Sequence, residues 1–291
     1  MEITTDSTLI QLIRIQLLCN KVATIPWKTT SVPQSFLVKS LASDLESLTR
    51  ALPPALESNG KHRSLKLMAR SNRLIEILQL ATFHTIIVVH EHSLDACPAS
   101  TTTLERIDSL WATLSATKSW FTLFFCLDVI PLFQYPQLAM PVFNQLAHCL
   151  IVLFRLSTFE MPEWDRKRVR QELDLGETVK LMASRWEEVA TAANLNEGGV
   201  QNILGPAHDP DHGPWAYTRK KLLVVAHFWE MKLASMVQSD EGRPMTAEDN
   251  HFTFSTFNQQ QMEQMDFSNM DWLNDIWMGD YSGLELPGAL A

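Results

Sequence analysis

Apolar side chains recur every three or four residues along most of this chain, which is the spacing of helices that bury one face. The clearest such stripe consists of Leu37, Leu41, Leu45, Leu48 and Leu52. Pro53 and Pro54 follow it directly. Proline cannot continue a helix, because it lacks a backbone N–H and its ring clashes with the preceding turn. The stripe therefore predicts a helix that ends before Pro53.

The same periodicity predicts a series of further helices. They cover residues 62–90, 104–116, 120–129, 142–157, 178–195 and 215–237. Strand-like alternation is scarce and glycines are few, so we expect an all-α fold, a multi-helix bundle-like domain over residues 1–240. From residue 241 the composition shifts to Phe, Gln, Asn, Met and acidic residues. This shift predicts a linker and a largely disordered acidic tail over residues 241–291.

One uncharged stretch, Val129–Phe154, is long enough to be a candidate membrane span. It is interrupted by Pro131, Pro136 and Pro141 and by several Gln and Asn side chains. A lipid-spanning helix needs about 20 mostly apolar residues in succession. We therefore interpret the stretch as two buried helices joined by a proline-rich turn, with a membrane span as the alternative.

Charge is distributed unevenly along the chain, whose formal net charge is -9. Arg243 is the last basic residue and eight carboxylates follow it, which leaves 25 acidic and 24 basic residues in the rest of the chain. The body is thus almost neutral, and the acidity belongs to the tail. This distribution argues against direct nucleic-acid binding by the tail, because contacts to phosphates need Lys and Arg.

The sequence carries no short signature of catalysis or cofactor binding. It has no phosphate-binding glycine loop, no GxSxG and no HExxH. Its four cysteines are widely spaced, which predicts neither a disulfide framework nor a cysteine zinc site. The N-terminus has acidic residues before its apolar run, unlike a secretory signal peptide. We expect no catalytic residues, no metal site and no cofactor.

Three histidine-containing groups could have a chemical role, and a structural interpretation is preferred for each. They are His208, Asp209, Asp211 and His212; His90, Glu91 and His92; and His148 with Cys149. The first has metal-ligand types but the composition of an ordinary surface loop. The second is expected to end a long helix, where cationic side chains suit the dipole. In the third, sequence neighbours on a helix do not face each other, so the thiol is expected to pack as a small hydrophobe.

Basic and aromatic runs receive similar interpretations. The runs at 166–170 and 219–221 are expected to be solvated helix faces, with nuclear import signals as the alternative.

The aromatic segments Trp120–Phe125 and Val142–Phe154 are expected to form part of the hydrophobic core. Their alternative is the wall of a pocket, which would make the chain a helical small-molecule-binding protein or an enzyme.

The segment MDFSNMDWLNDIWMGDYSG, residues 265–283, predicts a short partner-binding helix between Ser268 and Gly279. A helix of about ten residues is marginal in water, so we expect it to fold in a partner's hydrophobic groove. The predicted groove anchors are Phe267, Met270, Trp272, Leu273, Ile276 and Trp277, and the predicted solubilising and steering charges are Asp271 and Asp275. The alternative is that the helix docks on the chain's own body.

Several segments together carry a resemblance to a known family. TFEMPEWDRKRVRQELDL precedes a helix of the KLMASRWEEV type, and the chain ends in the acidic-aromatic segment. LLCNKVATIPW and FLVKSLASDLESLTRALPP stand nearer the N-terminus. In the order and type of these segments the chain resembles the C-terminal regulatory and activation region of fungal transcription factors of the binuclear zinc cluster class. The likeness covers most of the chain and rests on pattern, without a short diagnostic motif.

The resemblance implies a nuclear transcriptional regulator whose activation tail binds a coactivator or another protein of the transcription machinery. Family members often control gene clusters for secondary metabolites, which is the context expected here. The family's zinc module needs six closely spaced cysteines, which this chain lacks. DNA is therefore an expected partner only indirectly, or through a zinc module in a missing N-terminal part. No membrane partner is expected, because the tail is acidic, and a homodimer and an effector-sensing role are left open.

Overall fold

The computed structural model describes residues 3–27, 32–50, 65–95, 102–127, 129–196 and 214–240. These residues form α-helices and short 3-10 helices with no β-strand among them, so the all-α prediction is confirmed. The chain divides into two compact units, and the division falls between Leu173 and Asp174.

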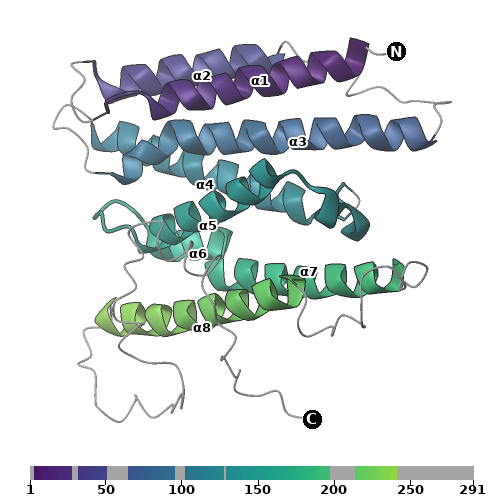
Figure 1. Ribbon diagram of the computed structural model, residues 1–291. Helices are drawn as coiled ribbons and strands as arrows, with labels where there is room; N and C mark the ends of the chain where they lie inside the picture. Colours follow the sequence, from purple (N-terminus) through teal and green to yellow (C-terminus); the bar gives the residue numbers. More distant parts are fainter. Residues whose placement is uncertain are drawn as a thin grey trace, which may run out of the picture. The chain divides into compact units, whose positions relative to one another are not determined.

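The described part of the first unit has six α-helices and two 3-10 helices. They are α1 (Ile3–Ala23), α2 (Gln34–Arg50), α3 (Leu65–His90), η2 (Glu91–Leu94), α4 (Thr103–Phe125), η3 (Leu132–Gln137), α5 (Met140–Thr158) and α6 (Arg166–Glu172). Helices α1 and α2 lie side by side against α3, and α4 packs on α3 as well (Figure 1). Helix α5 contacts both α3 and α4, and α6 packs on α5. The long helix α3 is thus the element that connects the layers of this unit.

The leucine stripe of α2 packs into the core between α1, α2 and α3. The buried members of this core are Ile15, Leu18, Val22, Leu41, Leu45, Leu78 and Val89. Full burial of one such side chain stabilises the fold by about 1.5–3 kcal/mol. Helix α2 ends at Arg50, as the prolines at 53 and 54 predict.

Aromatic side chains of α4 form the second core of this unit, as predicted. The rings of Trp120 and Phe124 are fully buried and stack at a centroid distance of 4.9 Å. The Tyr135 hydroxyl donates to the Phe124 carbonyl at 2.7 Å, and Trp120 Nε1 donates to Gln145 Oε1 at 3.3 Å. These residues, which we call the aromatic core, therefore have a packing role rather than that of a pocket wall.

Two of the predicted boundaries in this unit are wrong. Residues 104–116 and 120–129 belong to one continuous helix, α4, because the intervening residues contain no helix breaker. Thr117, in that gap, is buried and donates its hydroxyl to the Thr113 carbonyl. In the proline-rich stretch only α5 is an α-helix, since Pro131 and Pro136 confine the residues before it to the 3-10 turn η3.

One described helix, α5, is long and apolar enough to cross a membrane by length and composition alone. Half of its apolar window is buried inside the structure. The core helix of a soluble protein meets the same test, so this property is weak evidence for a membrane span.

The described part of the second unit is a pair of helices, α7 (Leu175–Asn196) and α8 (Pro214–Asp240). Lys180 pairs with Glu230 at 2.8 Å and Glu187 with Arg219 at 3.3 Å, which is the order expected for antiparallel helices. The predicted apolar stripe of α7 is buried, as are facing residues of α8; the set comprises Val179, Met182, Trp186, Val189, Leu222, Ala226 and Trp229. At Gly176 an added Cβ would lie 3.1 Å from Trp229 Cδ1, so glycine permits the close contact there.

The two basic runs have different environments. In α6, Asp165 caps the helix by accepting from the backbone N–H groups of Lys167 and Arg168, and both of these side chains are exposed, as predicted. In α8, Lys221 is only 3% exposed, so its interpretation as part of a solvated face is wrong. Leu222, which follows it, is buried as well, in a helix that packs against α7.

Candidate functional site

The predicted partner-binding residues lie outside the part of the chain that the structure describes. They are Phe267, Met270, Asp271, Trp272, Leu273, Asp275, Ile276 and Trp277. The loop with His208 and His212 also lies outside it, as does the whole predicted tail after Asp240. These remain predictions.

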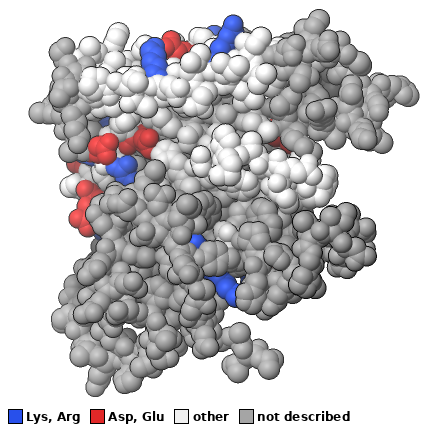
Figure 2. Space-filling model, in the orientation of Figure 1, with Lys and Arg blue, Asp and Glu red and all other residues white. Residues whose placement is uncertain are grey.

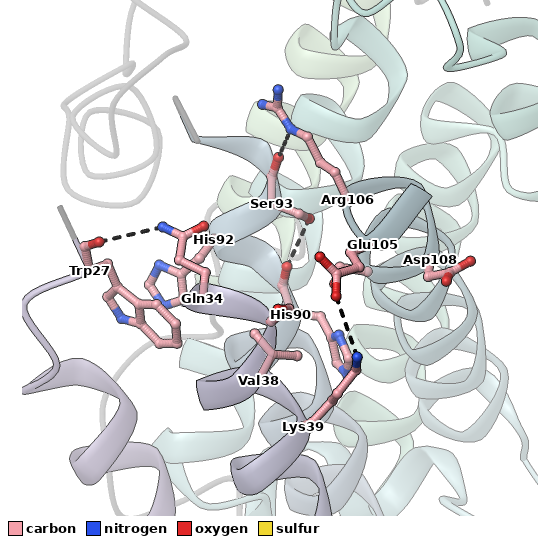
Figure 3. A pocket seen from close by; sticks show the side chains of 12 residues that line it. Trp27, Gln34, Val38, Lys39, His90, His92, Ser93, Glu105, Arg106 and Asp108 are labelled. Atoms are coloured by element: carbon pink, nitrogen blue, oxygen red, sulfur yellow. Dashed lines mark hydrogen bonds and ion pairs between the residues drawn. The ribbon is translucent and has the colours of Figure 1, made fainter. Parts of the chain in front are cut away.

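The site that the structure does describe is a polar pocket in the first unit. A cavity of about 180 Å³ opens where the start of α2, the end of α3 and the start of α4 meet (Figure 3). It is lined by Trp27, Gln34, Ser35, Val38, Lys39, His90, His92, Ser93, Glu105, Arg106, Asp108 and Ser109. All of these except Val38 carry a polar or charged group, although carbon atoms contribute most of the lining surface. We call this cavity the polar pocket.

The end of α3 brings two histidines into the polar pocket. Helix α3 ends at His90, as predicted, and the chain tightens into the 3-10 turn η2. The Ser93 hydroxyl donates to the His90 carbonyl at 2.8 Å, and Arg106 of α4 donates to the carbonyls of Ser93 at 2.8 Å and Asp95 at 2.7 Å. These bonds fix the turn against α4, so that both His90 and His92 line the cavity.

An aromatic wall borders the polar pocket on one side. The rings of Trp27 and His92 are stacked, with centroids 3.9 Å apart and planes 24° apart. Trp27 Nε1 donates to the Val22 carbonyl at 3.2 Å, and Gln34 Nε2 donates to the Trp27 carbonyl at 3.4 Å. The indole is therefore held in place by its hydrogen bond to α1 and by stacking, and Gln34 of α2 holds the backbone of Trp27 (Figure 3).

The charged side chains of the pocket largely neutralise one another. Lys39 Nζ lies 3.4 Å from Glu105 Oε1, but the lysine side chain is 75% exposed, so this ion pair is weak. Hydrogen bonds from Thr102, Ser35 and Lys39 lower the pKa of Glu105 and keep it ionised. Asp108 is exposed and forms no ion pair with another described residue.

His90, which lines the pocket, has one unsatisfied polar atom buried inside the fold. Its Nδ1 is buried and has no hydrogen-bond partner among the described residues. Burial lowers the pKa of His90, because it disfavours the charged imidazolium, so the ring is neutral near pH 7. Leaving a buried polar atom unpaired costs about 1–3 kcal/mol.

A chain of partly buried side chains, which we call the histidine cluster, connects α3, η2 and α5. His84 Nε2 lies 2.9 Å from His148 Nδ1, and His148 Nε2 lies 2.8 Å from Glu91 Oε2. Burial and the neighbouring His148 lower the pKa of His84 to about 3. An ionised carboxylate can only accept, so His148 donates to Glu91, and a neutral His148 then accepts from His84 Nε2–H.

The cysteine next to His148 is a packing residue, as predicted. Cys149 is fully buried, and burial together with the nearby Glu91 carboxylate raises the pKa of its thiol well above the usual value. A thiol that stays protonated is a poor nucleophile. His148 directs its ring to Glu91 and His84 instead, so the two neighbours do not act as a pair.

The face drawn in Figure 2 shows little concentration of charge among the described residues. In Figure 2 the Lys and Arg side chains and the Asp and Glu side chains of the described residues lie singly or in small mixed groups. Among the described residues, no three His, Cys, Asp or Glu side chains are placed to hold a metal ion. This face agrees with the nearly neutral body expected from the sequence.

Sequence analysis did not find the polar pocket or the histidine cluster. The sequence pattern placed His90, Glu91 and His92 at the end of a helix, but the side chains that contact them are far away in the chain. His84 and His148 are 64 residues apart, and Glu91 and His148 are 57 apart. The only feature of the sequence that could have indicated the cluster is the presence of several histidines on the predicted helices.

Comparison with known proteins gives two matches that bear on identity. The family model ATEG07667_C, described as a C-terminal domain, matches residues 132–290. A curated protein of Penicillium oxalicum named transcription factor opdL is 29% identical over 203 residues, which is 67% of this chain and 32% of that protein. The chain thus spans about a third of the length of this relative. No solved structure matches significantly.

These matches support the coarse form of the predicted resemblance, which is the C-terminal region of a fungal transcription factor. They do not bear on whether a zinc module accompanies it. The family match extends over more than half of the residues, from η3 to within one residue of the end of the sequence. The chain belongs to the ATEG07667_C C-terminal domain family.

Proposed function

We propose that this chain is the C-terminal regulatory and activation region of a fungal transcriptional regulator, acting in the nucleus and without enzymatic activity. Residues 1–240 form the helical regulatory domain, and residues 241–291 form a linker and an activation tail. The supporting observation is that the family match continues past α8 to residue 290 and so includes the acidic-aromatic segment. The name of the curated relative, transcription factor, supports a regulatory role for the chain.

The tail binds a coactivator or another protein of the transcription machinery by folding on it. Apolar anchors at Phe267, Met270, Leu273, Ile276 and Trp277 recur at helical spacing, and such anchors enter a hydrophobic groove. The cost of ordering the segment is met by the apolar area that it buries. Carboxylates on the other side of the helix keep the free segment soluble and speed its encounter with a basic rim.

Contact with DNA is made indirectly, or through a zinc module elsewhere in the full protein. The described body carries mixed charge on the face in Figure 2, which gives no electrostatic basis for binding phosphates there. Control of a secondary-metabolite gene cluster is the biological context that the resemblance supports.

A reporter assay tests the tail directly. Residues 248–291 are fused to an unrelated DNA-binding domain, and reporter output is measured against that domain alone. We expect output well above background, and a return to near background when Trp272, Leu273, Ile276 and Trp277 are changed together to alanine. Output at background from the unaltered tail would contradict the proposal.

A matched control separates the anchor face from aromatic content in general. Changing Phe252, Phe254 and Phe257 to alanine removes three aromatic rings upstream of the predicted helix. We expect this variant to retain most of the output. Equal loss in both variants would mean that the predicted helix has no special role.

A further inference from the structure

We propose that α1 carries a self-association surface, through which two copies of this chain pair in parallel along an exposed apolar stripe. The stripe consists of Leu9, Ile10, Ile13 and Leu17, and we call it the α1 stripe. The proposal goes beyond the proposed function, because it concerns the described body and does not involve the tail.

Helix α1 is apolar on two opposite sides. Ile15, Leu18 and Val22 are buried in the core that α1 forms with α2 and α3. The four members of the α1 stripe are 53%, 48%, 52% and 61% exposed, in chain order. Each residue advances about 100° around a helix axis, so this second set points away from the core. A helix that is apolar all round is normally buried on every side, so the α1 stripe is expected to be covered by a partner.

The α1 stripe lies in an outer layer of the first unit. Helices α1 and α2 lie side by side over α3 (Figure 1). The same region in Figure 2 consists mostly of uncharged atoms, with single basic and acidic side chains. Contiguous exposed apolar patches on soluble proteins mark interaction sites. A second protein surface can therefore cover the stripe without removing many charges from water.

The surroundings of the α1 stripe match an apolar partner with little net charge. Lys21 is paired with Asp44 at 2.9 Å, and Arg14 is exposed beside the stripe. A segment as acidic as the chain after Arg243 matches this surface poorly, because its eight carboxylates would meet little positive charge. In a twofold pair the same patch lies on both sides, so aliphatic side chains pack on aliphatic side chains. A second copy of this chain therefore meets the requirement.

The polar residues beside the stripe favour a parallel pair. Arg14 and Lys21 lie on one flank of the stripe, and Gln16 and Asn20 lie on the other. Gln16 Nε2 donates to Asn20 Oδ1 at 3.2 Å, so the second flank is uncharged. Two parallel helices related by a twofold axis along their length place each basic flank against the uncharged flank of the other copy. An antiparallel pair would place Arg14 beside its own copy, where like charges repel.

The size of the α1 stripe predicts a weak, reversible pair. Stable interfaces bury about 800 Å² per partner. Four aliphatic side chains that are each about half exposed provide clearly less area than that. We therefore expect a dimer Kd of about 10–100 µM. Two copies then pair mainly where another contact raises their local concentration.

Analytical ultracentrifugation of the full chain tests the pairing. Concentrations from about 2 µM to about 500 µM bracket the expected Kd. We expect the mass of one chain at the lowest concentration and a mass approaching that of two chains at the highest. A monomer throughout, or an assembly larger than a dimer, would overturn the proposal.

Three variants locate the interface. Ile13→Asp and Leu17→Glu each place a charge in the stripe, so each should raise the dimer Kd at least about tenfold. Leu104→Asp is the matched control, because Leu104 is a 68% exposed apolar residue on α4, and it should leave the Kd unaltered. All three positions are exposed, and circular dichroism checks that the variants fold. A dimer that persists in both stripe variants, or that is lost equally in the control, would overturn the proposal.

Cysteine cross-linking tests the orientation. In a parallel pair Leu17 faces its own copy, so Leu17→Cys alone should give a disulfide-linked dimer when oxidised glutathione is added. In an antiparallel pair Leu17 would lie opposite Ile10, and cross-linking would need a mixture of Leu17→Cys and Ile10→Cys. Gln16→Cys, on the flank, and the unaltered chain with its own cysteines set the background. Cross-linking only in the mixture would overturn the parallel arrangement, and background levels in all samples would overturn the pairing.

Discussion

The aromatic core and the histidine cluster bury polar atoms in different ways, although both pack against α5. In the aromatic core, Trp120 and Tyr135 each pair one neutral donor with one neutral acceptor, on Gln145 and Phe124. In the histidine cluster, His84 bonds to His148 and His148 bonds to the Glu91 carboxylate, so every member of the cluster is a titratable group. The aromatic core is therefore stabilised at any moderate pH, whereas the histidine cluster depends on the protonation of His84.

Truncation of the aromatic core should have the largest effect on stability. Trp120 is fully buried and stacks on Phe124. Trp120→Ala leaves a large cavity and an unpaired Gln145, so we expect a loss of about 3–5 kcal/mol in the free energy of unfolding. Urea denaturation at pH 7.5 measures it. As a control, Trp27→Ala removes a half-buried indole and should cost clearly less; equal losses would remove the distinction between core and pocket wall.

Acid should weaken the histidine cluster while sparing the aromatic core. His84 has a pKa of about 3 in the folded chain and about 6.5 when unfolded. Between these values the unfolded chain binds more protons, so stability is complete above pH 6.5 and falls as the pH falls toward 3. The steepest slope is about 1.4 kcal/mol per pH unit for this one group. Urea denaturation at several pH values between 4 and 7.5 measures the slope.

A variant that lacks His84 provides the control for this slope. His84→Phe removes the titrating group from the cluster and should flatten the dependence between pH 4 and 6.5. His227→Gln, in the second unit, should keep the original slope. An unchanged slope in His84→Phe would show that His84 is not the group that couples folding to pH.

Removal of the carboxylate from the cluster should have an intermediate effect. Glu91→Gln keeps the shape of the side chain but weakens the hydrogen bond to His148, so we expect a loss of about 1–2 kcal/mol at pH 7. A double-mutant cycle with His148→Gln isolates the interaction between the two side chains. A coupling energy near zero would mean that the 2.8 Å contact does not stabilise the fold.

The ion pairs of the second unit should contribute least. Lys180 and Glu230 lie 2.8 Å apart, but their side chains are about half exposed. Lys180→Met should therefore reduce the free energy of unfolding by less than about 1 kcal/mol, and 1 M NaCl should remove most of the difference. A larger loss of stability that persists in 1 M NaCl would show that this ion pair contributes substantially to the fold.

Local patterns predicted most of the helices, because each buries one face and ends at a recognisable residue. The stripe of Leu41 and Leu45 in α2 and that of Val179 and Trp186 in α7 are examples. The predicted helix boundaries were wrong where no helix-breaking residue separated two apolar segments, as in α4. They were also wrong where prolines favoured a 3-10 turn, as in η3.

The candidate site was largely beyond the reach of the sequence, for a physical reason. The Trp27–His92 stack and the His84–His148 bond join residues more than 60 positions apart, and helical periodicity carries no information about such pairs. The basic run at 219–221 was likewise expected to be a solvated face, although Lys221 is buried. Sequence patterns report on residues that are close together in the chain. They therefore predict individual helices, whereas the site depends on contacts between helices.

The central functional claim is that activation resides in the tail, and comparison of two tethered forms tests it most directly. Residues 1–291 and residues 1–240 are each fused to the same unrelated DNA-binding domain and expressed to equal levels, and reporter output is measured. We predict strong output from the longer form and background output from the shorter one. Equal output from the two forms, or activation by residues 1–240 alone, would contradict the account.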